Sequence, residues 1–243
     1  MKRLTVLAVL VSAFTVLLAQ DRGSIEYFGQ AAFRIVTADG VQIVIDPAEF
    51  KGYSMPEYLT ADIVTMSHEH MDHNNMSSLA PGFVQIHGCT PDNQALIPVD
   101  TTIDGVHIYN ISSYHNPGKH ALNAVFVYDF DDVRLAHLGD IGTTLTSSQI
   151  VAIGDLDILV LPVGGHYTIG LKEAHEIVGQ LAENTIVIPM HFKTEAFDYL
   201  PNTADDFLKD LENVVRVRSH RMEIPELTDS TGVVYYLLDY LKN

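Results

Sequence analysis

Ser67-His68-Glu69-His70-Met71-Asp72-His73 is the stretch around which the rest of the chain is organised. It follows residues 61–66 (Ala-Asp-Ile-Val-Thr-Met), an apolar and β-branched run that predicts a buried strand. Three imidazoles and a carboxylate placed this close together form the ligand set that Zn²⁺ and similar ions take in proteins. The stretch therefore predicts a metal-binding loop at the end of a strand.

The spacing of the histidines favours a loop over a helix. His68 and His70 would point to opposite sides of a helix, because only residues three or four apart share a helix face. In an extended or turning segment, residues two apart share a side. His68 and His70 can therefore hold one ion, while Asp72 and His73 point towards a second ion. The helical zincin pattern, with histidines four apart around a glutamate, does not fit this stretch.

The composition of the chain limits its class and its partners. Its 243 residues are 47% hydrophobic, which suits a sizeable core. The formal net charge is −17, so nucleic acid is not an expected partner, because phosphate backbones are bound by clustered Lys and Arg. Cys89 is the single cysteine, which excludes an internal disulfide. We expect a small-molecule substrate, and composition leaves the oligomeric state open.

The N-terminus has the plan of a secretory signal peptide. Lys2 and Arg3 form a positive region, and Leu4–Leu18 is an apolar run without a charge. This run is short for a transmembrane helix, which needs about 20 apolar residues. We expect residues 1–19 to be a signal peptide and the protein to be exported, to the periplasm or the extracellular space. An uncleaved N-terminal membrane anchor is the alternative.

From Ser24 the chain alternates strand-like runs with turn signals, and after Asp140 it changes to strand–helix–strand units. The expected early strands are 24–28, 32–37, 41–46, 62–66, 83–87, 106–114, 123–128 and 133–138. The expected later elements are helices over 146–153, 171–181 and 204–211 and buried strands over 156–161, 185–189 and 233–238. No linker interrupts residues 20–243, which predicts one domain. The pattern predicts the α/β class, as a layered sandwich with helices outside buried strands.

The residues suited to chemistry recur at the C-terminal ends of predicted strands, where ligands collect in α/β folds. Asp46, His68, His115, Asp140 and His191 all occupy that position. Seven candidate metal ligands could then converge. They are His68, His70 and His115 for one ion, Asp72, His73 and His191 for a second, and Asp140 between the two.

Candidate catalytic and supporting roles follow from that arrangement. Asp140 would bridge the ions, and Asp72 would ligate the second ion and take a proton from the attacking water. Asp46 is a candidate acceptor for an imidazole N–H behind the ligands, although a turn residue before Pro47 is an equally good reading. His137, just before the Leu-Gly-Asp turn, is a second candidate for such a supporting role.

The motif resembles that of the metallo-β-lactamase fold superfamily. The resemblance rests on His68-x-His70-x-Asp72-His73, His115, Gly139-Asp140 and His191, with similar stretches over 44–47, 61–75, 137–140, 159–168 and 188–194. Within the superfamily, the chain looks like the metal-dependent hydrolases of the ascorbate-6-phosphate lactonase-like and N-acylphosphatidylethanolamine phospholipase D-like branches. The resemblance implies a four-layer αββα sandwich with a one- or two-metal site along the edge between its sheets.

The chain departs from the family pattern at two positions. Family members often carry His-Asp where this chain has His115-Asn116, which puts any role of that aspartate in doubt. Cys89 lies outside the metal motif, so the Asp-Cys-His arrangement of true β-lactamases is missing and antibiotic hydrolysis is not expected. Three further residues are candidate substrate contacts: His166, Tyr167 and Lys193.

We expect a metal-dependent hydrolase that attacks a small ester or lactone with a metal-bound hydroxide. One or two divalent ions are expected, zinc first, with manganese, iron or nickel also compatible with His and Asp ligands. A metal held by neutral histidines lowers the pKa of bound water to about 7. The ester preference follows from the lack of a long basic patch for a polyanion. A phosphodiesterase using the same site, and a non-catalytic metal- or ligand-binding protein that keeps the fold, are the alternatives.

Overall fold

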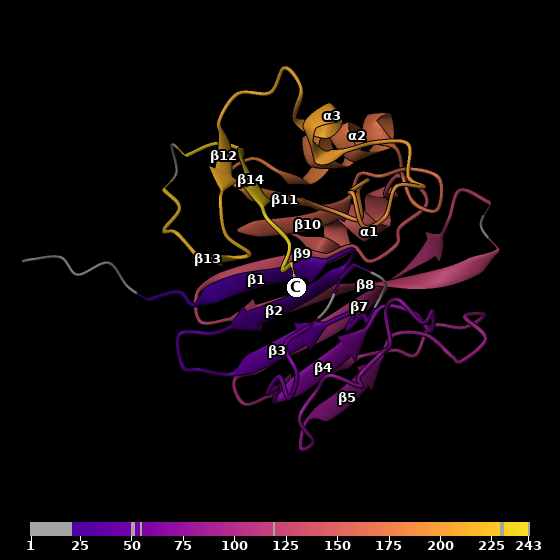
Figure 1. Ribbon diagram of the computed structural model, residues 1–243, viewed down its shortest axis with the longest axis vertical. Helices are drawn as coiled ribbons and strands as arrows, with labels where there is room; N and C mark the ends of the chain where they lie inside the picture. Colours follow the sequence, from indigo (N-terminus) through magenta and orange to yellow (C-terminus); the bar gives the residue numbers. More distant parts are fainter. Residues whose placement is uncertain (1–20, 50–51, 54, 119, 229–230, 243) are drawn as a thin grey trace, which may run out of the picture.

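The computed structural model describes residues 21–49, 52–53, 55–118, 120–228 and 231–242 (Figure 1). These residues form two β-sheets, and one large apolar cluster fills the space between the sheets. Strand residues such as Ile25, Phe33 and Ile43 enter the cluster from one sheet. Ile108 and Phe126 enter it from the other sheet. The expected signal peptide, residues 1–19, lies outside the described residues.

The first sheet has six strands and is antiparallel at one side and parallel at the other. In spatial order it contains β13 (Arg221–Glu223), β1 (Ser24–Gly29), β2 (Ala32–Val36), β3 (Gln42–Ile45), β4 (Ile63–Met66) and β5 (Val84–His87). Strands β3, β4 and β5 run parallel, so β3 and β4 end at the same edge. That edge carries Asp46 and the histidine loop.

The second sheet has eight strands and mixes the two pairing modes in the same way. In spatial order it contains β12 (Val214–Val217), β14 (Val234–Leu238), β11 (Ile186–Met190), β10 (Ile158–Pro162), β9 (Val133–His137), β8 (Ala121–Phe130), β7 (Val106–His115) and β6 (Asp100–Ile103). Strands β9, β10 and β11 are parallel, and β7 runs in their direction because β8 is antiparallel to both β7 and β9. The ends of β7, β9 and β11 therefore meet at one edge of the sheet.

Three helices occur in the described part of the chain, all beside the eight-stranded sheet (Figure 1). They are α1 (Ser147–Ile153), α2 (Leu171–Leu181) and α3 (Ala204–Leu208). Capping boxes begin two of them: Thr146 and Thr203 each accept a hydrogen bond from the backbone N–H three residues on. Helix α2 buries Ala174, Ile177 and Val178 among its apolar residues, so its packing comes from one amphipathic face.

The α/β class and the two-sheet sandwich predicted from the sequence are confirmed. The outer face of the six-stranded sheet is apolar at Phe28, Val44 and Val64, and the connecting segments cover it. Met55 and Leu59 pack there from described residues that form turns and bridges rather than a helix. Turn-forming residues in these connections explain the irregular covering, because proline and glycine interrupt helices.

Strands β6, β12 and β13 were not expected from the sequence. Each has three or four residues and lies at a sheet edge, and most of its residues are exposed or half-buried. Short edge strands of this kind bury few side chains and leave little periodic signal. Within the described residues, no helix has both the length and the apolar character needed to cross a membrane.

Candidate metal centre

The seven predicted ligands come together where strands of both sheets end. Asp46 follows β3, and the loop carrying His68 and His73 follows β4. His115 ends β7, Asp140 follows β9 within a short turn, and His191 follows β11 directly. The adjoining parallel strands β10 and β11 bury long apolar runs, so this edge rests on a rigid core. The loops that carry the candidate ligands are therefore attached to buried strands of the eight-stranded sheet.

The possible donor atoms of these residues lie close enough to one another to bind the same ions. His68, His70 and His115 form one group whose donor atoms are all within 4.8 Å of one another. Asp72, His73 and His191 form a second group by the same measure, and His68, His73 and Asp140 link the two. The grouping is the one expected from the sequence.

Asp140 occupies the centre of the arrangement. Its Oδ2 lies 3.3 Å from His73 Nε2, 3.4 Å from His115 Nε2 and 3.5 Å from His191 Nε2. Gly139 precedes it with φ +54°, and a Cβ there would come within 2.3 Å of the Asn123 side-chain oxygen. Only glycine fits this turn, and the turn brings a short carboxylate between histidines from three different strands.

Asp46 supports the ligand loop from behind. Its carboxylate accepts hydrogen bonds from Ser67 N (2.6 Å), from Ser67 Oγ (2.7 Å) and from His73 Nδ1 (2.9 Å). It is fully buried and has a φ of +46°, a backbone conformation that few non-glycine residues adopt. Because Asp46 holds His73 Nδ1, the Nε2 of that ring faces Asp140. The residue therefore does more than end a strand.

His137 supports the turn that carries Asp140. Its Nε2 donates to Ala31 O at 3.0 Å, and its Nδ1 accepts from Gly139 N at 3.2 Å. Both ring nitrogens are thus used within the protein, and burial lowers its pKa. His137 holds the glycine turn in place and has no nitrogen left to bind an ion.

Burial and charge shift the pKa values of the ligands in opposite directions. Burial lowers the pKa of His68 well below its usual value, and the neighbouring His73 lowers it further. Burial also lowers the pKa of His70. For His73 burial acts in the same direction, but the carboxylates of Asp140 and Asp46 outweigh it and hold its pKa well above the usual range. The pKa of Asp140 is held well below its usual value because nearby histidines outweigh its burial. Without an ion, His73 and Asp140 thus form a buried charge pair.

The donor set fits divalent ions. His73 Nε2 and Asp140 Oδ1 are buried and have no hydrogen-bond partner. Buried polar atoms without partners are rare in native proteins and point to a missing water or ion. Neutral imidazoles and carboxylates in groups of three are also the donors that zinc and related metals select. His68, His70 and His115 would hold one ion, and Asp72, His73 and His191 would hold another, with Asp140 shared.

A cavity of about 270 Å³ opens onto these donors. Beside the ligands it is lined by Met71, Tyr167 and Phe197. Tyr167 was a predicted substrate contact, whereas Met71 and Phe197 were missed. The position of Met71 between two ligands in the motif was an available signal, and the structure leaves its side chain 77% exposed. Nothing in the sequence distinguishes Phe197 from a core residue.

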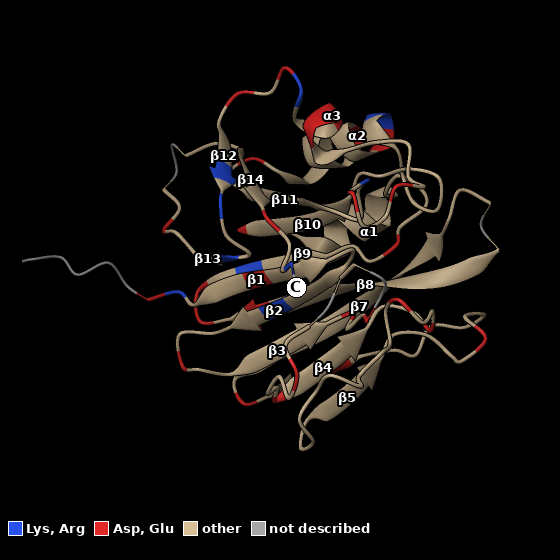
Figure 2. Ribbon diagram, in the orientation of Figure 1, with Lys and Arg blue, Asp and Glu red and all other residues tan. Residues whose placement is uncertain are grey.

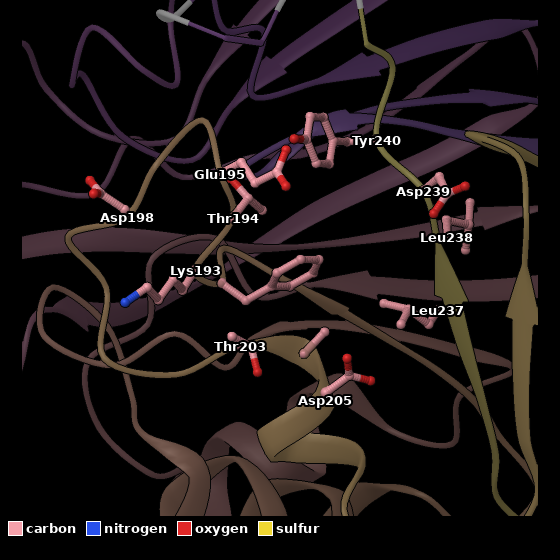
Figure 3. A pocket seen from close by; sticks show the side chains of 12 residues that line it. Lys193, Thr194, Glu195, Asp198, Thr203, Asp205, Leu237, Leu238, Asp239 and Tyr240 are labelled. Atoms are coloured by element: carbon pink, nitrogen blue, oxygen red, sulfur yellow. The ribbon is translucent and has the colours of Figure 1, made fainter.

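The other two predicted substrate contacts lie beside this cavity rather than on its wall. His166 is exposed, with φ +64°, and its ring packs edge-on against Tyr167 at 4.3 Å between centroids. Lys193 lines a separate cavity of about 460 Å³, together with Thr194 and Glu195 of the segment that follows β11 (Figure 3). In Figure 3 its amino group points away from Leu237 and Tyr240 on the far wall.

Two neighbours of the ligands make contacts that were not expected from the sequence. Asn116, in place of the aspartate frequent in the family, has its side-chain amide nitrogen 3.2 Å from His115 Nδ1. Glu69, between His68 and His70, points away from the centre: its Oε1 lies 2.5 Å from His87 Nδ1, and its Oε2 accepts from Asn74. Glu69 therefore ties the ligand loop to strand β5, a contact that no spacing rule reveals.

The sequence matches a family model described as "Beta-lactamase superfamily domain" over residues 24–191. A "UPF0173 metal-dependent hydrolase" of Thermococcus onnurineus is 31% identical over 194 residues, covering 70% of this chain and 84% of that protein. A protein of the same name from Staphylothermus marinus is 31% identical over 211 residues, covering 78% and 91% of the two chains.

Solved structures agree with these relatives. The crystal structure of a Thermotoga maritima protein, described as a candidate Zn-dependent hydrolase of the metallo-beta-lactamase superfamily, is 36% identical with a TM-score of 0.70. The match covers 89% of this chain and 99% of that one. A candidate metal-dependent hydrolase from Parabacteroides distasonis has a TM-score of 0.60 over 89% of this chain and 93% of that one. At 19% identity it supports the fold alone.

Proposed function

This chain belongs to the metallo-β-lactamase superfamily and is a metal-dependent hydrolase, and we propose that it uses two divalent ions, zinc first, to hydrolyse a small ester or lactone. The proposal of two ions rests on two donor groups that meet at Asp140 Oδ2. The proposal of zinc rests on the histidine-rich ligand set.

The residues of the chain have separable tasks in this reaction. When bound, the ions supply an activated water and polarise the substrate oxygen that gains charge. Asp140 holds its carboxylate between the two donor groups and offsets the repulsion between the ions. Asp72 is half-buried at the cavity wall, so its carboxylate can both ligate and accept the proton of the attacking water. Asp46 keeps His73 in the tautomer whose Nε2 faces the centre.

The lining of the cavity favours an acyl substrate over a phosphoryl one. Met71, Tyr167 and Phe197 offer apolar and aromatic surface next to the ligands, and none of the described residues that line the cavity is a Lys or Arg. Among the described residues, Lys and Arg lie scattered over the ribbon, with β2, β12, β13 and α2 among their positions (Figure 2). A phosphodiester brings negative charge that the ions would meet, but no Lys or Arg among the described lining residues adds to them. An ester or lactone carbonyl flanked by an apolar group suits this lining better.

The proposal is tested by metal analysis and substrate screening of the same purified protein. Protein stripped with a chelator is reloaded with Zn²⁺, Mn²⁺, Fe²⁺ or Ni²⁺ and assayed on matched panels of lactones, aryl esters and phosphodiesters. We expect about two ions per chain and turnover of esters or lactones. Turnover of phosphodiesters alone would contradict the proposed ester or lactone substrate and favour a phosphodiesterase. Two bound ions without turnover of any substrate class would favour a non-catalytic binding protein.

We further propose that the protein acts outside the cytoplasm. The support is the sequence of residues 1–19, with a basic start followed by an apolar run. Mature protein from the native host should begin near Gln20 and fractionate with exported proteins. N-terminal sequencing that finds Met1 on soluble cytoplasmic protein would contradict export. Met1 on membrane-bound protein would show an uncleaved anchor instead.

A further inference from the structure

Gln30 is a buried polar residue whose side chain has no hydrogen-bond partner. It lies in the turn between β1 and β2 and is 1% exposed, and both its Oε1 and its Nε2 are unpaired. Its φ of +53° falls in the left-handed region, which disfavours most side chains. A buried amide in a strained turn is costly, and such a group in a native protein calls for an explanation.

The turn that carries Gln30 lies against the metal centre. The backbone carbonyl oxygen of Gln30 accepts hydrogen bonds from His191 N at 2.9 Å and from Tyr27 OH at 3.2 Å. The carbonyl oxygen of Ala31, the next residue, accepts from His137 Nε2 at 3.0 Å. The backbone of this turn therefore already contacts a candidate ligand and the residue that supports the Asp140 turn.

His191, like Gln30, has a buried side-chain atom without a hydrogen-bond partner. Its Nε2 faces Asp140 Oδ2 at 3.5 Å, while its Nδ1 is buried and has no partner. A histidine that ligates through Nε2 carries its proton on Nδ1 and almost always donates it to an acceptor. His73 has such an acceptor in Asp46, at 2.9 Å. His191 lacks one in the present arrangement.

We propose that Gln30 is the positioning residue of His191. Its side-chain carbonyl accepts the Nδ1–H of His191, directly or through one buried water, when the ring ligates an ion. The backbone hydrogen bond from His191 N to Gln30 O, at 2.9 Å, holds the two residues next to each other, which brings the ring within reach of a glutamine side chain. This inference rests on the metal centre proposed above. It explains why a buried, strained turn keeps a polar residue whose amide is otherwise unused.

The test separates metal affinity from the stability of the metal-free protein. Gln30→Met keeps the size of the side chain and removes its polar atoms. Metal-free Gln30→Met should melt at the same temperature as the wild type or higher, because an unpaired buried amide is removed. Its affinity for the ion held by Asp72, His73 and His191 should fall by about 10- to 100-fold, as expected for loss of a ligand's hydrogen-bond partner. Affinity is measured by competition with a chromophoric chelator using Zn²⁺.

Two further variants control the interpretation. Gln30→Glu keeps an oxygen acceptor at the same reach and should retain affinity close to the wild type. Ser24→Ala removes the hydroxyl of another buried residue with an unpaired oxygen, at the opposite end of β1, and should leave affinity unchanged. If Gln30→Met does not fold, Gln30→Asn replaces it, since asparagine tolerates positive φ but is one carbon too short to reach the ring.

The outcomes distinguish this inference from the metal centre itself. Wild-type protein that binds no second ion would overturn the two-ion proposal. Wild-type protein that binds two ions, with Gln30→Met binding them equally well, would overturn only the role of Gln30. A lower melting temperature of the metal-free variant with unchanged affinity would show that Gln30 serves packing alone.

Discussion

His73 Nδ1 lies 2.9 Å from Asp46 Oδ2, and both side chains are fully buried. The contact joins the histidine loop after β4 to the end of β3, so two strands of one sheet fix the orientation of a single imidazole. The other nitrogen of that ring, Nε2, then faces Asp140 on the opposite sheet. One hydrogen bond thus determines which nitrogen of His73 is offered to an ion.

Asp46→Asn should weaken metal binding without removing a ligand. The amide can present an N–H to His73 where the carboxylate only accepts, which favours the tautomer with the proton on Nε2. We expect affinity for the ion held by His73 to fall by about 10- to 100-fold. Chelator competition measures it. Asp205→Asn, which changes an exposed carboxylate paired with Arg216, is the control and should bind as the wild type does.

A buried hydrogen bond between the two sheets leads to a prediction about the free energy of unfolding. Thr65 Oγ1 on β4 and Tyr128 OH on β8 are 2.6 Å apart and both residues are fully buried. Tyr128→Phe leaves the threonine hydroxyl unpaired, so unfolding free energy should fall by about 1–3 kcal/mol. Adding Thr65→Val should recover part of the loss in a denaturant titration. Additive losses from the two single variants would show that the hydroxyls are not coupled.

The sequence predicted which side chains would lie close together because strand ends and ligand chemistry are both local signals. A buried run followed by His68, His115 or His191 places a ligand at a sheet edge, and parallel strands then bring such edges together. The helices over 147–153 and 171–181 were found for a similar reason, since amphipathic spacing and capping residues are readable within one segment.

Features that depend on tertiary neighbours could not be predicted. Gln30 is an ordinary turn residue until the structure places its carbonyl oxygen beside His191. Phe197 becomes a cavity wall only because its loop folds back over the centre. Lys193 lies two residues from a ligand, yet its side chain lines another cavity, because sequence proximity does not determine which way a loop side chain points.

His70→Ala should reduce metal occupancy and abolish hydrolysis together. His70 belongs to the donor group with His68 and His115, and its loss leaves two imidazoles for that ion. Metal content and turnover are measured on the same preparation. His220→Ala, at a histidine that belongs to none of the three donor groups, should change neither. Full occupancy in His70→Ala would remove His70 from the ligand set.

Metal binding should release a proton at neutral pH. Asp140 and Asp46 hold the pKa of His73 well above its usual value despite its burial, so the metal-free ring is protonated, and coordination requires the neutral ring. Affinity should therefore rise with pH until the raised pKa is passed. In the metal-free protein the same shift stabilises the fold fully below about pH 6.5, and this contribution is lost as pH rises through the raised pKa.

Calorimetric titration with Zn²⁺ in two buffers of different ionisation enthalpy measures this proton. His68 should contribute little, because burial lowers its pKa and the ring is already neutral. The release should shrink as the titration is moved to higher pH. Two ions bound at pH 7 with no proton released would mean that His73 is neutral in the metal-free protein.

Asp140→Asn tests the shared position of this carboxylate. Asp140 Oδ2 lies within 3.5 Å of histidines that belong to both donor groups, so one charge serves two ions. A bridging carboxylate offsets the repulsion between two cations, and an amide of the same shape does not. Double occupancy should therefore suffer more than single occupancy. We expect Asp140→Asn to keep about one ion and to lose most activity, because one ion supplies only part of the stabilisation of attacking and leaving oxygens.

Asp140→Asn must be compared with Asp72→Asn to assign the bridge. Asp72 belongs to one donor group only, so its amide variant should weaken one ion and leave the other at wild-type affinity. Asp140→Asn should lower the affinity of both, because His115 of one group and His73 and His191 of the other lose the carboxylate that faces their Nε2 atoms. Two tightly bound ions and wild-type turnover in Asp140→Asn would reduce Asp140 to a turn residue. Equal effects of the two substitutions on each ion would place the bridge elsewhere.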